Sequence, residues 1–396
     1  MAQKHAAPAD EHKRHQLVWT VLRPLMRLIC WLRMGYRALP ADVQGPFLLV
    51  ANHVTYWDPI LAGCSFGQQM YFVASEHILR SRPFGKLITW LQDPIPRQKG
   101  GSATSTVLTM MRRLKKGENV AIFPEGNRCW DGLTRPFLPS IGKLARTSGA
   151  KLVTYRFIGG YFTSPRWAGA DIRRGKMRGS VVRVYSPEEL KGMTPDEINE
   201  HIREDLSEDA YERARKNPIR FRGRRLAEHM ERLLFICPRC GRMHTLQSQD
   251  DTVKCWKCGF SFRYLPTGFL AGKDLPYDNI RDWSRWQDGE IRRACDEAAV
   301  DRPIFSDTDV YSHEVMTARD STPLGKGEMK LYPDRIEIPG VTIPLSELSG
   351  ISLMGGQDLY LGANGRSYLV RSSFTRCMVK YLTACAYLNN NADYGV

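Results

Sequence analysis

The first half of the chain alternates short apolar runs with amphipathic segments, a pattern typical of an α/β fold. The run from Pro46 to Ala51 has the length and composition of a buried strand, and Asp58-Pro59 reads as a helix start. A second apolar run, from Asn119 to Phe123, ends abruptly and is followed by the segment PEGNR, which contains polar and charged residues. We therefore expect an α/β domain whose strands end in polar loops, where such proteins commonly place their chemistry.

In the last part of the chain, apolar and polar residues alternate with a period of two. From Gly327 onward, short segments of alternating apolar and polar residues predict antiparallel strands, and Asn364-Gly365 predicts a tight hairpin. A helix is expected next, because the apolar positions follow i, i+3, i+4, i+7 spacing. These positions are Phe374, Cys377, Met378, Tyr381, Leu382 and Cys385. Residues 326–396 are thus predicted to form a β-rich domain closed by one helix, a pattern that resembles a pleckstrin-homology-like (PH-like) module.

Residues 1–44 contain an amphipathic segment with a basic side. Arginines interrupt the apolar stretch from Gln16 to Tyr36, so it is too short to cross a bilayer. On a helix, Arg23, Arg27, Arg33 and Arg37 fall on one side. Such a helix can lie on an anionic membrane surface, or it can pack against the protein's own core. The net charge of +15 favours an anionic partner without choosing among nucleic acid, membrane and phosphorylated molecules.

Four of the ten cysteines form two Cys-x2-Cys pairs. Cys237 and Cys240 lie in CPRCG, and Cys255 and Cys258 lie in CWKCG. Four thiolates, with glycines that allow tight turns, predict a tetrahedral Zn²⁺ site in a zinc ribbon at residues 233–265. Four protein ligands leave no position for a substrate, so the zinc is expected to be structural; a redox dithiol is the alternative. The other six cysteines are scattered singly, which indicates reduced thiols in the cytoplasm.

Polar groups capable of chemistry follow the apolar runs. His53 lies between the first run and the helix start at Asp58, and Glu125 and Arg128 follow the second run. Arg97 ends the proline-rich stretch DPIPR, which reads as a loop able to hold an anion. Each residue alone also fits a surface turn or a helix cap. Their combination favours a single site at the strand ends.

These motifs resemble those of the glycerolipid acyltransferases, the family of bacterial 1-acylglycerol-3-phosphate acyltransferase. The likeness rests on NHVTYWD, DPIPR and FPEGNR and covers residues 45–190. It implies an acyltransferase-type α/β domain there, with His53 and Asp58 as catalytic residues. The residues implied for binding the acceptor are Arg97, Glu125, Gly126 and Arg128. Two departures stand out: Asn127 replaces the family's usual Thr or Ser, and LVTYRFIGGYF lacks the central proline of the fourth motif.

The resemblance implies transfer of a fatty acyl group from an acyl thioester to the hydroxyl of a lysophospholipid. A neutral imidazole, with an ordinary pKa of about 6.5, suits removal of the hydroxyl proton, so His53 is the expected base and Asp58 its partner. The planar guanidinium of arginine matches the geometry of phosphate oxygens, so Arg97 and Arg128 are expected to bind the acceptor's phosphate. Glu125 is expected to orient Arg128 or an acceptor hydroxyl. The expected acceptor is 1-acylglycerol 3-phosphate, and the expected product is phosphatidic acid. The expected donor is acyl-CoA or acyl-carrier protein.

Two other interpretations stay open. A zinc ribbon and the arginines among residues 220–225 also fit a nucleic-acid-associated protein, but basic residues are spread along the chain and His53 and Asp58 would go unexplained. The other is an inactive acyltransferase fold that serves as a scaffold. We expect an enzyme in the cytoplasm, peripheral on the inner face of the cell membrane. Residues 191–232 are expected to form a charged helical linker and residues 266–325 a second linker.

Overall fold

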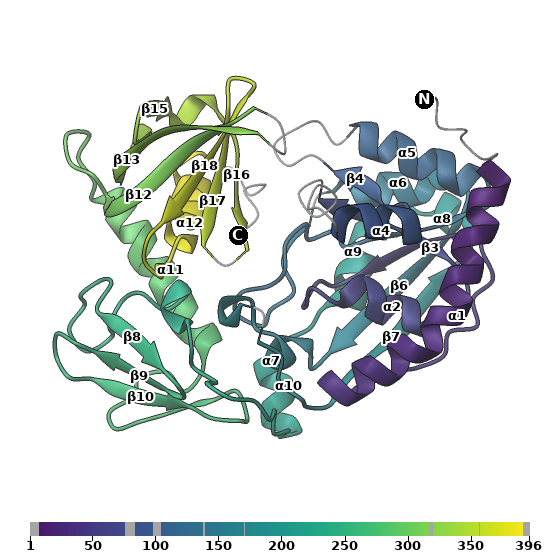
Figure 1. The fold of residues 1–396 in the computed structure, drawn as a ribbon, viewed down its shortest axis with the longest axis horizontal. Coiled ribbons are helices and arrows are strands. Elements are labelled where there is room, and N and C mark those ends of the chain that lie inside the picture. The colour runs from purple at the N-terminus through teal and green to yellow at the C-terminus, as the bar shows by residue number, and fades with distance from the viewer. Residues whose placement is uncertain are drawn as a thin grey trace. The chain divides into compact units, whose positions relative to one another are not determined.

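A computed structural model describes residues 8–75, 84–97, 104–137, 139–169, 171–316, 320–355 and 357–390. The chain forms two compact units that interleave along the sequence (Figure 1). Unit 1 comprises Met1–Gly126, Pro136–Thr163 and Arg174–Glu208. Unit 2 comprises Asn127–Arg135, Ser164–Arg173 and Asp209–Val396. Both units therefore contain parts of the region expected to form the acyltransferase domain.

Unit 1 is built on a seven-stranded, mostly parallel sheet with the strand order β1-β7-β6-β2-β5-β3-β4. β7 runs antiparallel to β6, and the other neighbouring strands are parallel. β2 is buried at every residue, because helices cover both faces of a parallel sheet, and its sequence FLLVA is accordingly apolar throughout. The strands are β1 Tyr36–Ala38, β2 Phe47–Ala51, β3 Met70–Ser75, β4 Ile95–Arg97, β5 Asn119–Ile122, β6 Lys151–Ile158 and β7 Met177–Tyr185.

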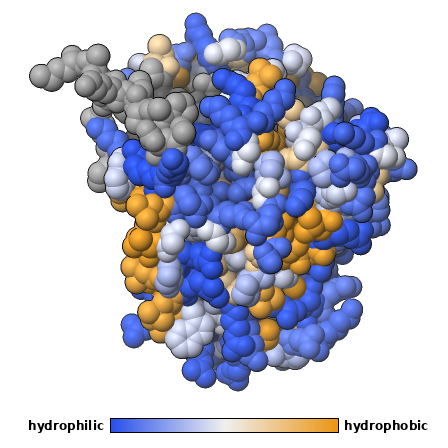
Figure 2. Space-filling view, turned by 90° about the vertical axis from the view of Figure 1, so that its right-hand side faces the viewer, coloured by the Kyte–Doolittle hydropathy of each residue, from blue (hydrophilic) through white to orange (hydrophobic). Residues whose placement is uncertain are grey.

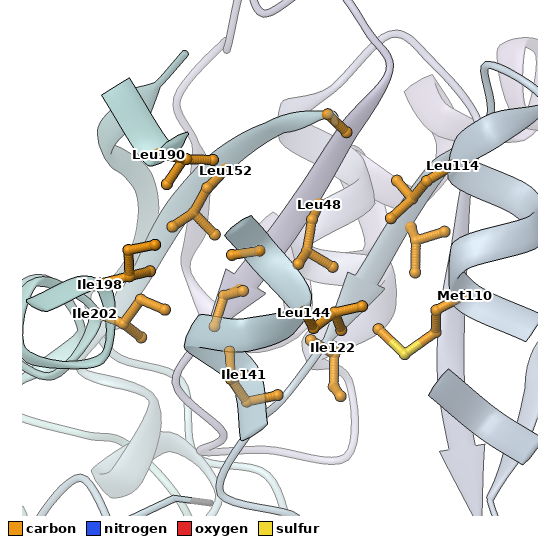
Figure 3. Packing of buried hydrophobic residues seen from close by; sticks show 14 of the residues in the cluster. Leu48, Met110, Leu114, Ile122, Ile141, Leu144, Leu152, Leu190, Ile198 and Ile202 are labelled. Carbon is orange, nitrogen blue, oxygen red and sulfur yellow. The ribbon is translucent and has the colours of Figure 1, made fainter. Parts of the chain in front are cut away.

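Helices pack on unit 1's sheet through alternate side chains of its strands. On one face Leu48 of β2 joins a core with Leu114 of α5 and Leu144 of α6, which Figure 3 shows. On the other face Phe47 contacts the ring of Phe66, just after α2. The helices are α1 Pro8–Met34, α2 Asp58–Ser65, α4 Phe84–Gln92, α5 Thr104–Lys115, α6 Ser140–Ser148, α7 Gly160–Thr163, α8 Pro187–Gly192 and α9 Pro195–Leu206.

Helix α1 has two different sides. Trp19 and Cys30 are buried, and Trp19 packs so closely on α2 that a Cβ added at Gly63 would lie 2.7 Å from its ring. Another side of α1 leaves large apolar side chains exposed, namely Leu17, Val21, Leu25, Leu28, Trp31 and Leu32. We call these six residues the α1 stripe. Within the described part of the chain, none of the helices combines the length and the apolarity that crossing a membrane requires.

Unit 2 contains a small ribbon of four antiparallel strands in the order β11-β10-β9-β8. Its strands are β8 Leu246–Gln249, β9 Thr252–Cys255, β10 Ser261–Tyr264 and β11 Leu270–Ala271. Helix α11, Ile280–Asp296, packs on this ribbon through Trp283, whose ring contacts Phe260 and Phe262. Three short helical segments complete this part: η1 Arg166–Ala168, α10 Ala210–Lys216 and η2 Met230–Arg232.

The C-terminal part of unit 2 is a seven-stranded antiparallel sheet in the order β15-β14-β13-β12-β18-β17-β16. Helix α12, Val379–Leu388, is held to it by Asp307 of β12, which accepts a hydrogen bond from the Tyr381 hydroxyl and pairs with Lys380 at 2.6 Å. The predicted β-rich domain closed by one helix is confirmed. The strands are β12 Phe305–Val315, β13 Ser321–Leu331, β14 Arg335–Ile338, β15 Val341–Pro344, β16 Leu348–Met354, β17 Asp358–Ala363 and β18 Arg366–Ser372, with the short turn η3 Leu345–Glu347.

Both segments expected to be linkers contain elements of the folded units. Within residues 191–232, helix α9 contributes Ile198 and Ile202 to the core of unit 1. Within residues 266–325, α11 forms and the C-terminal sheet already begins at Phe305, upstream of the expected boundary at 326. β12 escaped prediction because two of its buried positions, Asp307 and Ser312, are polar, and the first half of β13 escaped because it is almost entirely exposed and carries no apolar alternation.

Candidate active site

His53 lies in the loop between β2 and α2, as the sequence predicts. Its Nδ1 lies 2.8 Å from Oδ2 of Asp58, and its ring stacks on Phe123 with the centroids 4.5 Å apart. A carboxylate only accepts hydrogen bonds, so Nδ1 carries the hydrogen and Nε2 of the neutral ring keeps its lone pair. The His53 side chain is 21% exposed. This pair therefore offers a base whose tautomer is fixed.

Asp58 is the fully buried centre of this loop. Its carboxylate accepts hydrogen bonds from the backbone N–H groups of Val54 (2.6 Å) and Thr55 (2.9 and 3.0 Å). The Thr55 hydroxyl donates to it as well, at 2.6 Å. Hydrogen bonds to an ionised acceptor are roughly twice as strong as neutral ones, and they compensate the cost of burying the charge. Asp58 therefore holds the loop in shape as well as orienting His53.

Glu125 joins the loop after β5 to the loop after β2. Its Oε1 accepts a hydrogen bond of 2.7 Å from the backbone N–H of His53, and the side chain is buried. The two loops meet because β2 and β5 are parallel neighbours, so that their carboxyl ends lie at one edge of the sheet. The sequence predicted Glu125 at this edge but not its bond to the His53 backbone.

Arg97 ends β4 at the same edge, because β5, β3 and β4 are parallel neighbours. A Cβ added at Gly126 would lie 3.2 Å from Nη1 of Arg97, and the backbone of Gly126 has a φ of +68°, which glycine adopts most readily. Burial lowers the pKa of the Arg97 guanidinium. Within the described ranges, none of the ion pairs involves Arg97. Unit 1 thus gathers five predicted site residues at one edge of its sheet: His53, Asp58, Arg97, Glu125 and Gly126.

Arg128 belongs to unit 2, although Gly126 and everything before it belong to unit 1. Its guanidinium is buried and donates from Nη1 to the carbonyl oxygen of Ser164, at 3.4 Å. Its own carbonyl oxygen accepts a hydrogen bond of 2.9 Å from Arg166. The motif FPEGNR therefore spans the boundary between the units, which sequence alone did not predict.

Asn52 is a structural partner that the site prediction missed. Its side-chain oxygen accepts from the backbone N–H of Phe157 at 2.7 Å, and its amide donates to the Phe157 carbonyl at 3.1 Å. These two bonds tie the start of the catalytic loop to β6. The signal was present, since Asn52 directly precedes His53 at the end of a buried strand, where a buried amide needs partners.

The predicted metal ligands come together in unit 2. The sulfur atoms of Cys237, Cys240, Cys255 and Cys258 all lie within 4.8 Å of one another. Gly241 and Gly259 have positive φ values of +66° and +74°, as the tight turns after each pair require. Burial raises the pKa of the Cys255 thiol, but a hydrogen bond with Thr245 and backbone N–H groups outweigh it and bring the pKa to about 6. Four thiol donors without a carboxylate fit a soft, tetrahedral ion such as Zn²⁺.

Unit 1 contains most of the region that matches a known protein family. Residues 34–158 match the family model described as Acyltransferase. The chain carries an acyltransferase-family domain. The matched residues of this acyltransferase domain include β1 to β6 and the loops that hold His53, Arg97 and Glu125.

Curated relatives of the acyltransferase domain share one description. The chain is 26% identical over 175 residues to "1-acyl-sn-glycerol-3-phosphate acyltransferase BAT2, chloroplastic" of Brassica napus, a match that covers 44% of this chain and 49% of that protein. It is 25% identical over 195 residues to the 1-acyl-sn-glycerol-3-phosphate acyltransferase of Bacillus subtilis, covering 45% of this chain and 92% of that protein. The chain thus spans about half the length of the plant relative.

Similarity to solved structures was also found. One example is the 1-acyl-sn-glycerophosphate (LPA) acyltransferase PlsC from Thermotoga maritima, at 20% sequence identity and a TM-score of 0.41. The likeness covers 49% of this chain and 78% of that one.

Proposed function

We propose that the protein transfers a fatty acyl group from an acyl thioester to the free hydroxyl of 1-acylglycerol 3-phosphate, which yields phosphatidic acid. The observation that carries the proposal is the His53–Asp58 pair, 2.8 Å apart, with Asp58 fully buried beneath it. The acyltransferase domain around this pair and the shared description of the relatives support the reaction class and the acceptor.

The proposed mechanism needs no covalent intermediate on the enzyme. Nε2 of His53 takes the proton from the acceptor hydroxyl as its oxygen attacks the thioester carbonyl. Asp58 stabilises the imidazolium that forms, through the bond to Nδ1. When the tetrahedral intermediate collapses, the carbon–sulfur bond breaks and the leaving thiolate takes the proton from His53. Glu125 keeps the His53 backbone in place during these steps.

The acceptor's phosphate is proposed to bind to Arg97 and Arg128. Support for Arg97 comes from its half-buried guanidinium, which lies so close to Gly126 that a Cβ added there would be 3.2 Å from Nη1. A partly desolvated cation of this kind favours an anion as ligand. The donor is proposed to be acyl-CoA or acyl-carrier protein. The four cysteines of unit 2 are proposed to hold a structural Zn²⁺ that stabilises the ribbon.

The protein is proposed to act in the cytoplasm, on the inner face of the cell membrane. The α1 stripe supports this, because six large apolar side chains on one helix are 45% to 67% exposed. Figure 2 faces the side of the molecule that carries α1 in Figure 1, and it shows hydrophobic residues gathered among hydrophilic ones. An exposed apolar stripe of this kind suits insertion into the headgroup region of an anionic bilayer.

The test is acyl transfer from radiolabelled acyl-CoA to 1-acylglycerol 3-phosphate with anionic vesicles, by the wild type and by His53→Ala. We expect phosphatidic acid from the wild type only, while the variant retains the circular dichroism spectrum and melting temperature of the wild type. Turnover by a folded His53→Ala at the wild-type rate would refute the mechanism. No product from the wild type, with acyl-carrier-protein donors and other lysophospholipids also tried, would refute the function and favour a scaffold.

A further inference from the structure

Arg166 connects the proposed phosphate ligand Arg128 with the C-terminal sheet of unit 2. Nη1 of Arg166 donates to the carbonyl oxygen of Arg128 at 2.9 Å, and Nη2 donates to the carbonyl oxygen of Leu353 on β16 at 3.2 Å. The guanidinium lies over the ring of Trp130, 4.3 Å from its centroid. All these residues belong to unit 2, and the Arg166 side chain is buried. One planar fork thus bridges two backbone positions that are far apart in the sequence.

The residues that follow Arg166 are fixed to the ribbon. The ring of Trp167 meets Tyr264 of β10 edge to face, with centroids 5.5 Å apart. Arg173 lies near both rings and donates to the carbonyl oxygen of Leu226. Trp167 and Arg173 are almost fully buried. At the start of the same segment, the carbonyl oxygen of Ser164 accepts from Arg128. The segment Ser164–Arg173 therefore contacts the ribbon, the C-terminal sheet and Arg128.

We infer that Arg166 is a positioning residue, which holds Arg128 at the geometry that the acceptor's phosphate requires and makes acceptor binding depend on the C-terminal sheet. The inference rests on the proposed function, specifically on the role of Arg128. Its physical basis is that Arg128 is fixed at both ends by this segment: its guanidinium by Ser164, and its backbone by Arg166. A guanidinium that donates two buried hydrogen bonds resists displacement of either acceptor.

Replacing Arg166 should weaken binding of the acceptor more than it slows the acyl-transfer step. The bond between His53 and Asp58 and the backbone bond from Val54 to Asp58 are formed by residues of unit 1, and Arg166 takes no part in either. A shift of Arg128 would weaken the bond to the phosphate and raise the KM for the phosphorylated acceptor. The KM for the thioester donor should not change, because neither arginine is proposed to bind the donor.

The experiment uses the full-length protein with two substitutions, Arg166→Met and Arg166→Lys. Arg335→Met is the matched control, since Arg335 also lies over an aromatic ring of the C-terminal sheet, 3.8 Å from the centroid of Tyr332, but bonds Asp334 and Glu337 instead. The kinetic constants for 1-acylglycerol 3-phosphate, for acyl-CoA and for the unphosphorylated acceptor monoacylglycerol are measured for each protein. Circular dichroism and thermal melting establish that each variant is folded.

We expect the acceptor KM of Arg166→Met to rise on the order of tenfold, with the donor KM unchanged and the preference for the phosphorylated acceptor reduced by a similar factor. Arg166→Lys keeps one donor and a charge, so it should recover part of the loss. Arg335→Met should match the wild type. If Arg166→Met does not fold, the same shift in Arg166→Lys decides.

Two results would overturn the inference and separate it from the proposed function. Folded Arg166 variants with a wild-type acceptor KM, or with an equal loss toward both acceptors, would show that Arg166 does not position a phosphate ligand. No turnover by the wild type would instead refute the proposed function, and with it the basis of this inference.

Discussion

Asp58→Asn separates the chemistry of the His53 loop from its architecture. The substitution keeps the shape of the side chain but removes the charge that faces the imidazole at 2.8 Å. With the charge centres roughly 4 Å apart and an effective dielectric constant of about 20, the carboxylate stabilises an imidazolium by about 4 kcal/mol. Losing that interaction should lower kcat on the order of 10³-fold.

The same substitution should cost less in folding free energy than truncation. In Asp58→Asn the remaining oxygen can still accept from the loop, at the lower strength of a neutral acceptor, so the free energy of unfolding should fall by about 1–3 kcal/mol. Asp58→Ala leaves the buried N–H groups of Val54 and Thr55 without this acceptor. At about 1–3 kcal/mol for each donor, truncation should cost about 2–6 kcal/mol, a large part of an ordinary protein's stability.

The assay combines steady-state acyl transfer with denaturant unfolding of the same preparations. Thr55→Val is the control, because it removes one hydrogen bond to Asp58 while leaving the charge in place. It should lower stability by about 1–2 kcal/mol and leave kcat within a few-fold of the wild type. A folded Asp58→Asn with a wild-type kcat would refute the assignment of Asp58 as the partner of a catalytic base.

Three further outcomes are expected. Removing the metal with a chelator, or Cys240→Ser, should melt the ribbon at lower temperature; a metal-free wild type with an unchanged melting curve would contradict the zinc site. Leu25→Glu combined with Leu28→Glu should weaken binding to phosphatidylglycerol vesicles by about tenfold or more, whereas Val300→Glu, at a more exposed position in unit 2, should not. Equal losses of binding would exclude the α1 stripe as the membrane contact. Burial raises the pKa of Asp288 to about 6 against the partial opposition of Arg135. Ionisation of Asp288 therefore lowers the stability of the folded wild type as the pH rises from 3.8 to about 6. Asp288→Asn removes this loss, so its free energy of unfolding should exceed that of the wild type by an amount that grows over this range and stays constant above it. An excess that shrinks with rising pH would contradict this.

Much of the catalytic loop could be predicted from the sequence because its reactive residues lie close together along the chain. His53 lies in the loop after β2 and Asp58 begins α2, so a buried strand followed by a helix start predicts this arrangement without tertiary information. The order of the strands brings Glu125 and Arg97 to the same edge, as the rule for parallel sheets predicts. The expected four-cysteine cluster also forms, since spacing and glycines determine such knuckles locally.

The features that escaped prediction depend on contacts between distant segments. The bond from the His53 backbone to Glu125 joins two loops 72 residues apart. Arg166 lies in a stretch without a recognisable motif, and its role becomes visible only beside Arg128 and Leu353. The solvated first half of β13 forms a strand because β12 pairs with it, not because its own residues have an apolar side. A strand that is held by such pairing shows no alternation of apolar and polar residues in its own sequence, so the sequence does not predict it.

The interleaving of the two units limits how the protein can be dissected. A fragment that ends at Glu208 would retain Asn127–Arg135 and Ser164–Arg173 without the rest of the unit to which they belong. Trp167, which is fully buried in the full chain, would lose its contact with the ring of Tyr264 in that fragment. Such a fragment should aggregate, since large apolar surfaces that lose their partners associate with each other. Unit 2 therefore cannot be removed by a single cut of the chain, because its segments alternate with those of unit 1.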